Sequence, residues 1–67
     1  MKIRFLKTIG VDVHKGKLDE VWDKQYSRWD EVDAVSINSD YNKMTVRTAE
    51  GDTLLDVPCS AVEILNG

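Results

Sequence analysis

The chain has 67 residues, of which 42% are hydrophobic and 31% are charged, and its formal net charge is −3. This composition is typical of a folded domain, and a chain of this length is expected to form one domain, residues 1–67, with a small core. Such a domain cannot easily enclose a deep substrate cavity as well, so a binding module is expected and an enzyme is not. Apolar runs are too short to span a bilayer, and no signal peptide is visible, which favours a cytoplasmic protein.

Charge is distributed unevenly along the chain. Residues 1–17 carry five basic residues against one acidic residue, whereas residues 18–67 carry four basic against eleven acidic residues. The basic segment could bind nucleic acid, the acidic remainder could imitate the phosphates of DNA, or the two could neutralise each other within the fold. The overall acidity makes nucleic-acid binding the weaker hypothesis. The basic residues in question are Lys2, Arg4, Lys7, Lys15 and Lys17.

Residues 2–13 have the pattern of one or two strands, because apolar and polar residues alternate there. Leu6 interrupts the alternation and Gly10 follows shortly after it. We therefore expect a bulge or bend between these two residues. Residues 14–17, around a glycine, predict a turn.

Residues 18–32 fit two kinds of structure. Their apolar and aromatic residues recur at offsets of three and four, which is typical of a three-turn helix, and Glu20 and Lys24 would form a favourable pair on it. However, no N-cap residue precedes Leu18, and Trp, Tyr and Val side chains favour strands. We expect a long excursion after the first strand, irregular or with a short helix, and keep the three-turn helix as the alternative.

The β pattern returns in the second half of the chain. Val35 and Ile37 alternate with smaller or polar neighbours, residues 38–42 are typical of a turn, and residues 44–48 alternate again.

The C-terminal part has clear turn chemistry. Residues 50–52, Glu-Gly-Asp, predict a tight hairpin turn, and residues 53–57 its second strand. Pro58 ends that strand because it lacks a backbone donor. Residues 60–61 suit a single 3-10 turn, and residues 62–65 a last short strand.

The predicted order of elements resembles the Src-homology-3 (SH3) barrel. Residues 57–65, VPCSAVEIL, are similar to the ending of that family, Ile/Val-Pro-Ser-Asn-Tyr-Val-Glu-Leu-Leu. The resemblance implies a mainly β fold, a small five-stranded SH3-like barrel with a long excursion after the first strand and a 3-10 turn before the last. The chain also resembles small accessory proteins of phages and prophages.

The chain departs from the SH3 members that bind proline-rich peptides. Those members have an ALYDY-like first strand, a tryptophan pair after the excursion and a tyrosine in the last turn. Here the first strand reads KIRFLK, no paired tryptophans follow the excursion, and Ala61 stands at the tyrosine position. Because a polyproline groove needs several aromatic walls, binding of such peptides is not expected.

No catalytic, cofactor-binding or metal-binding constellation is visible in the sequence. His14 is the only histidine and lies in a lysine-rich turn. No serine of the chain has the nucleophile-elbow or oxyanion-type glycine context of a catalytic triad that would include this histidine. With the single cysteine, Cys59, His14 supplies too few ligands for zinc. Cys59 lies in an apolar stretch, which predicts a buried structural thiol in a reducing compartment.

The segment from Leu18 to Asp33 combines two tryptophans and a tyrosine with six acidic residues. Partly exposed Trp and Tyr are common at binding hot spots, and flanking carboxylates would steer a basic partner. We expect Tyr26 to face solvent and Trp29 to cap the core, while Trp22 fits either role. The leading hypothesis is a non-enzymatic module that binds and modulates a larger cytosolic protein, and open sheet edges also favour a homodimer. The candidate partner-binding residues are Asp19, Glu20, Trp22, Asp23, Tyr26, Trp29 and Asp30.

Overall fold

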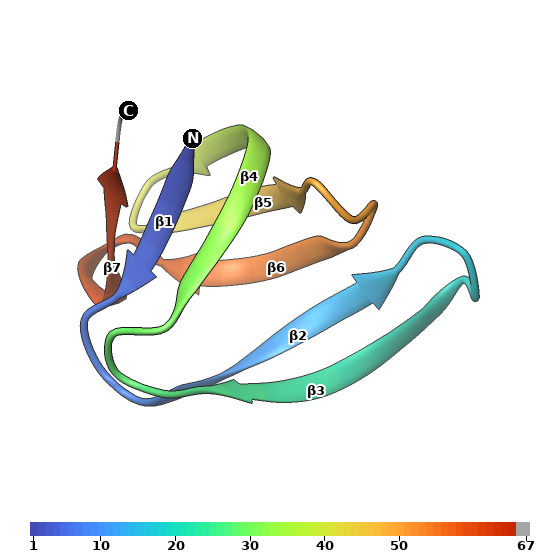
Figure 1. Cartoon of the computed structure of the whole chain (residues 1–67), viewed down its shortest axis with the longest axis horizontal. Coiled ribbons are helices and arrows are strands. Elements are labelled where there is room, and N and C mark those ends of the chain that lie inside the picture. The colour runs from blue at the N-terminus through green and yellow to red at the C-terminus, as the bar shows by residue number, and fades with distance from the viewer. Residues whose placement is uncertain (66–67) are drawn as a thin grey trace.

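Seven antiparallel strands and one 3-10 turn make up the part of the chain that the structure describes, residues 1–65 of a computed structural model (Figure 1). The elements are β1 (Lys2–Phe5), β2 (Ile9–Lys15), β3 (Glu20–Tyr26), β4 (Glu31–Asp40), β5 (Lys43–Thr48), β6 (Thr53–Pro58), η1 (Cys59–Ala61) and β7 (Val62–Leu65). The strand order is β3-β2-β6-β5-β4-β1-β7. The mainly β prediction is therefore confirmed. Seven strands stand where five were expected, and β3 and β7 lie at opposite ends of the order, so the sheet is not closed.

The longest strand, β4, connects two parts of the sheet (Figure 1). Its first residues, 31–33, pair with β1, and residues 34–40 pair with β5. The register shifts between Ala34 and Ser36, so Val35 is the extra residue of a β-bulge. The bulge reverses the alternation that the sequence suggests, because Ala34 is buried and Val35 is 62% exposed.

One hydrophobic cluster receives side chains from all seven strands. Ile3 and Phe5 of β1, Val46 of β5 and Val57 of β6 are fully buried. Burying one such side chain contributes roughly 1.5–3 kcal/mol, so these few residues dominate the stability of so small a core. The other members of the cluster are Val11, Val13, Tyr26, Ala34, Met44, Leu54 and Val62.

The segment that was ambiguous in sequence is a β-hairpin. All seven residues of β3 pair with β2, from Ile9 opposite Tyr26 to Lys15 opposite Glu20. Both expectations for this segment, the irregular or short-helical excursion and the three-turn helix, are therefore wrong. An offset of four residues is also an even number, so Trp22 and Tyr26 share one face of a strand as they would share one face of a helix. The β propensity of the aromatic and Val side chains decided between the two.

Most of the remaining local predictions hold, and two turns have other bounds than predicted. β1 ends at Phe5 and β2 begins at Ile9, which confirms the bend before Gly10. The hairpin turn around Gly51 is confirmed, with a φ of +93° at that glycine. β6 ends at Pro58, η1 follows as the 3-10 turn, and β7 has the predicted bounds. The first hairpin turn begins at Gly16, since β2 extends to Lys15, and the β4–β5 turn is shorter than predicted because β4 extends to Asp40.

Candidate partner-binding surface

The structure divides the predicted partner-binding residues into three places. Asp19, Glu20, Trp22 and Asp23 lie at the tip and along β3 of the hairpin, Tyr26 lies in the core, and Trp29 and Asp30 lie in the β3–β4 connection. Trp22 and Tyr26 are four residues apart on one strand, roughly 13 Å at about 3.3 Å per residue, and Trp29 lies beyond Tyr26. The two indoles therefore do not form one patch.

Tyr26 packs inside the sheet and does not face solvent, so that expectation is wrong. It is 8% exposed, and its ring stacks on Phe5 with centroids 4.4 Å apart. The reason is its place at the base of the hairpin, opposite Ile9, where β3 rejoins the core. Burial raises the pKa of the Tyr26 phenol, and the negative charges of Asp52 and then Glu50, with a smaller effect of Asp30, raise it further.

Trp29 is exposed, so the expectation that it caps the core is also wrong. It is 55% exposed, and its backbone has a φ of +75°, in the left-handed region. The backbone N–H of Trp29 donates to the Phe5 carbonyl at 2.7 Å, so the turn is fixed while the indole remains at the surface. The guanidinium of Arg28 lies over the indole, 4.5 Å from the ring centroid.

The turn around Trp29 is closed by its neighbours. The Asp30 carboxylate accepts a hydrogen bond from the Ser27 backbone N–H at 2.8 Å, and the Asp30 N–H donates to the Ser27 carbonyl at 3.0 Å. The Arg28 N–H donates to the Thr8 hydroxyl, so the β3–β4 connection lies against the β1–β2 connection (Figure 1). Asp30 is therefore engaged in the turn and is not a free acid beside the indole.

Trp22 is half-exposed on β3, opposite Val13 of β2. Its indole N–H donates to the Glu20 carboxylate at 2.8 Å, and the Lys15 ammonium lies 5.4 Å from its ring centroid. At the tip of the hairpin, the His14 ring hydrogen-bonds the Asp19 carboxylate at 2.9 Å.

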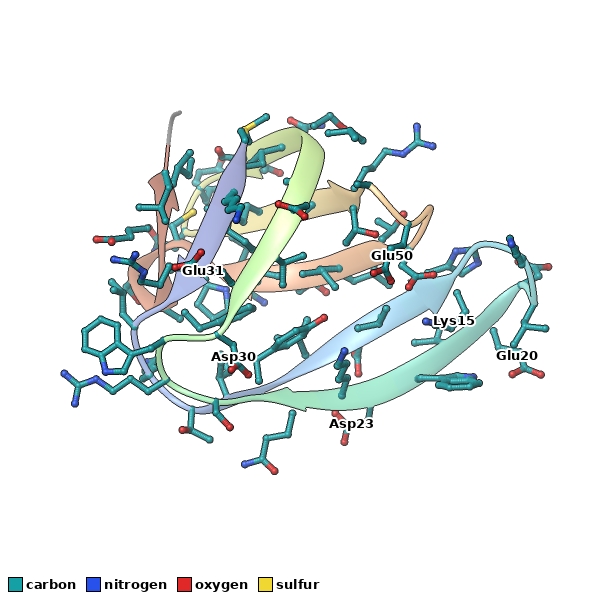
Figure 2. The ribbon with its side chains drawn as sticks, in the orientation of Figure 1. Lys15, Glu20, Asp23, Asp30, Glu31 and Glu50 are labelled. Atoms are coloured by element: carbon teal, nitrogen blue, oxygen red, sulfur yellow. The ribbon has the colours of Figure 1, made fainter. Side chains whose placement is uncertain are left out.

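An acid-lined hollow of about 260 Å³ lies between the hairpin, the start of β4 and the β5–β6 turn. It holds four carboxylates against two lysines, and the Lys15 ammonium pairs with Asp52 at 2.7 Å. Figure 2 shows Lys15 and Glu50 at one end of this region and Asp30 and Glu31 at the other. The lining residues are Lys15, Lys24, Tyr26, Glu31, Val32, Asp33, Thr48, Ala49, Glu50 and Asp52.

Sequence reasoning missed the acids that the β5–β6 turn brings to this hollow. Glu50 and Asp52 are more than twenty residues from the hairpin, and the sequence pattern around them indicates only a turn. Long-range pairing of β6 with β2 places them there, and no local signal in the sequence reports such a pairing.

The basic first strand is neutralised by acids of the same chain. Arg4 pairs with Glu31 at 3.0 Å and with Glu63 at 3.2 Å. Lys2 lies 3.8 Å from Glu31 and 3.9 Å from Asp33. The interpretation that the two charge sets complement each other within the fold is therefore confirmed for this strand.

The sequence candidates for reactive chemistry have ordinary surroundings. Cys59 is half-buried, more open than predicted, and packs against the hydrophobic cluster. Among residues 1–65, His, Cys, Asp and Glu side chains nowhere gather in threes at a distance suited to a metal ion. Over the same residues, no helix has the length and apolar character needed to cross a membrane.

Comparisons with known proteins gave no match for this chain. No family model matches it, and neither does a curated protein or a solved structure. What the chain binds must therefore be inferred from its own surface.

Proposed function

We propose that this chain is a small non-enzymatic protein-binding module and that Trp29 is the centre of its contact surface. The supporting observation is an exposed indole on strained backbone, 55% exposed at a φ of +75°. The left-handed conformation costs a residue with a side chain about 1–2 kcal/mol, and Gly would adopt it without strain. Trp29 is not a member of the core cluster, so contact with another molecule explains why a tryptophan stands there.

The hollow beside this turn favours a partner with a basic segment. Glu31, two residues after Trp29, lines the hollow. Three of the four carboxylates of the hollow pair with basic residues of this chain, and Glu50 has no ion pair within residues 1–65. The raised pKa of Tyr26 reports the same negative field, beyond the effect of its burial. Such a field accelerates the approach of a positively charged partner, while the indole supplies contact area. The partner that we propose is a larger cytosolic protein, bound and modulated by a phage or bacterial accessory protein.

We also propose that the fold is a variant of the SH3-like barrel in which the excursion is the β2–β3 hairpin. The support is the succession β1, hairpin, β4, β5, β6, η1 and β7, together with the pairing of β1 with both β4 and β7. Ala61, at the tyrosine position of the family, is fully buried. That position offers no aromatic wall to a polyproline peptide, so the proposed partner is of another kind.

The ion pairs of the basic segment, residues 1–17, count against the nucleic-acid alternative. Lys2, Arg4 and Lys15 each face a carboxylate of this chain within 4 Å, which leaves Lys7 and Lys17 from the basic segment. Two such lysines are too few for the dense basic footprint that phosphate binding requires.

Affinity capture from a bacterial lysate tests the proposal with two matched variants. Trp29→Gly removes the indole and leaves a residue that suits a positive φ. Tyr41→Gly does the same for a tyrosine that is 97% exposed at a φ of +56°, in the β4–β5 turn. We expect the wild type and Tyr41→Gly to retain the same protein, which raised salt releases, and Trp29→Gly to lose it.

Two results would contradict the proposal. One is equal capture by all three proteins, which would remove Trp29 from the contact surface. The other is loss of capture with Tyr41→Gly and not with Trp29→Gly, which would move the contact surface to the β4–β5 turn.

A further inference from the structure

The outer strand of the hairpin, β3, has a free edge. Within residues 1–65 it pairs with β2 alone and stands at the end of the strand order. The six residues from Glu20 to Gln25 are all exposed, among them Val21 at 59% and Trp22 at 49%. Figure 1 shows β3 on the outer side of the hairpin, and in the strand order β2 lies between β3 and β6. An edge strand without a proline or a bulge presents a row of backbone groups that can pair with another strand.

The side chains of β3 are arranged symmetrically in charge about Trp22. Glu20, Trp22 and Lys24 occupy alternate positions and therefore share one face of the strand. A second β3 laid antiparallel across Trp22 would set Glu20 of each copy opposite Lys24 of the other. The two indoles would lie opposite each other between these ion pairs, and both kinds of cross-strand pair are stabilising.

We propose that two copies of this chain associate through the free edges of β3, antiparallel, with Trp22 at the two-fold axis. Association of this kind continues the sheet from one copy into the next, through main-chain hydrogen bonds along the strand. The opposite charges on the two sides of Trp22 select the register.

Other central registers bring like charges together. Directly opposite residues of an antiparallel pair point to the same face, so the two-fold axis must pass through a residue position. An axis at Val21 sets Asp19 opposite Asp23 of the second copy. An axis at Asp23 sets the Asp23 residues of the two copies opposite each other, and an axis at Lys24 does the same for Lys24. Like charges directly opposite each other are destabilising. The axis at Trp22 avoids all of these contacts.

This association goes beyond the proposed function and leaves its surface free. Trp29 lies past the far end of β3, after Tyr26, roughly 13 Å or more from Trp22 along the strand direction. A dimer would present two copies of the Trp29 surface at once, which increases the avidity for a partner with two binding segments. The capture experiment with Trp29→Gly tests the proposed function, and the measurement of association tests the dimer. Either proposal can therefore fail without the other.

Sedimentation equilibrium measures the association directly. Edge pairing of one short strand buries less area than a stable interface does, so a weak dimer is expected over roughly 10 µM to 1 mM. The informative variants reverse one charge, E20K or K24E, or both together. E50K makes the same charge change as E20K, but in the β5–β6 turn, and serves as the control. Circular dichroism verifies that each variant is folded.

We expect the wild type and E50K to dimerise with the same dissociation constant. E20K and K24E should each weaken the dimer at least about fivefold, because each sets like charges opposite each other twice. The double variant E20K/K24E should restore the wild-type constant. A wild type that stays monomeric throughout the range, single variants that dimerise as the wild type does, or a double variant that fails to recover would each overturn the proposed register.

Discussion

The rings of Phe5 and Tyr26 stack nearly parallel, with centroids 4.4 Å apart and planes 7° apart. Phe5 ends β1 and Tyr26 ends β3, two strands that four others separate in the sheet order. The backbone N–H of Phe5 also donates to the Asp30 carbonyl at 2.8 Å, and its carbonyl accepts from Trp29. β1 and β3 do not pair with each other in the sheet. The stack and these two hydrogen bonds therefore hold the base of the hairpin against the first strand.

Removing the Tyr26 ring should therefore destabilise the whole sheet. We expect Tyr26→Ala to lower the free energy of unfolding by about 3 kcal/mol or more, because it leaves a cavity against a fully buried Phe5. Tyr26→Phe keeps the stack and should cost less than about 1.5 kcal/mol. Urea denaturation followed by circular dichroism measures both. An alanine variant as stable as the phenylalanine variant would show that the stack contributes little.

The raised pKa of the Tyr26 phenol predicts that the protein loses stability at alkaline pH. Its pKa is raised in the folded state by burial and by the charges of Asp52, Glu50 and Asp30, so folding favours the protonated phenol. That contribution is complete below the unfolded pKa of about 10 and is lost as the pH rises through the folded value. The fall in stability above pH 10 should be steeper for the wild type than for Tyr26→Phe, which lacks the titrating group. Equal slopes in the two proteins would contradict this linkage.

Gly16 allows the hairpin turn to pack against the β5–β6 turn. A Cβ atom built on Gly16 would lie 2.5 Å from the Gly51 carbonyl oxygen, a backbone atom that cannot easily move. We expect Gly16→Ala to cost about 1–3 kcal/mol and to shift the amide resonances of residues 50–52. Gly10→Ala, within β2 of the same hairpin, is the matched control, because its Cβ would meet only the Asp23 carboxylate at 3.4 Å. Similar costs for both substitutions would mean that the two turns are not held together.

The parts of the fold that could be predicted from sequence are those fixed by local chemistry. Gly51 and Pro58 act through their own backbones, and the turn and strand ends that they set were predicted correctly. The hairpin was not, because an apolar spacing of four suits both a helix and one face of a strand. The alternation around Val35 is interrupted by a bulge that leaves this valine exposed, and no residue of β4 signals that bulge.

The candidate surface was predicted in composition but not in arrangement. Tyr26 and Trp29 are three residues apart and exchange the roles that the sequence suggested, one buried and the other exposed. Tyr26 is the aromatic residue that enters the core, where its ring stacks on Phe5 of β1, a contact between residues 21 positions apart that no local pattern reports. The hollow likewise depends on Glu50 and Asp52, which only the β6–β2 pairing brings to the hairpin.

Asp56 gives a prediction about backbone strain within β6. Met44 and Val46 of β5 pair with Val57 and Leu54, so β6 carries an extra residue between its partners, and Asp56 has a φ of +52°. Glycine adopts that conformation freely, whereas alanine carries the Cβ penalty of about 1–2 kcal/mol. Asp56→Gly should therefore be about 1 kcal/mol more stable than Asp56→Ala, and at least as stable as the wild type.

The matched comparison is the same pair of substitutions at Asp12, an exposed residue of β2 that has no positive φ. In an ordinary strand, glycine is about 0.5–1 kcal/mol less favourable than alanine, so the order of the two variants should reverse there. Urea denaturation of the four proteins measures both differences under one set of conditions. The same order at both positions would show that Asp56 does not adopt the left-handed conformation, and the bulge in β6 would then have to be formed by another residue.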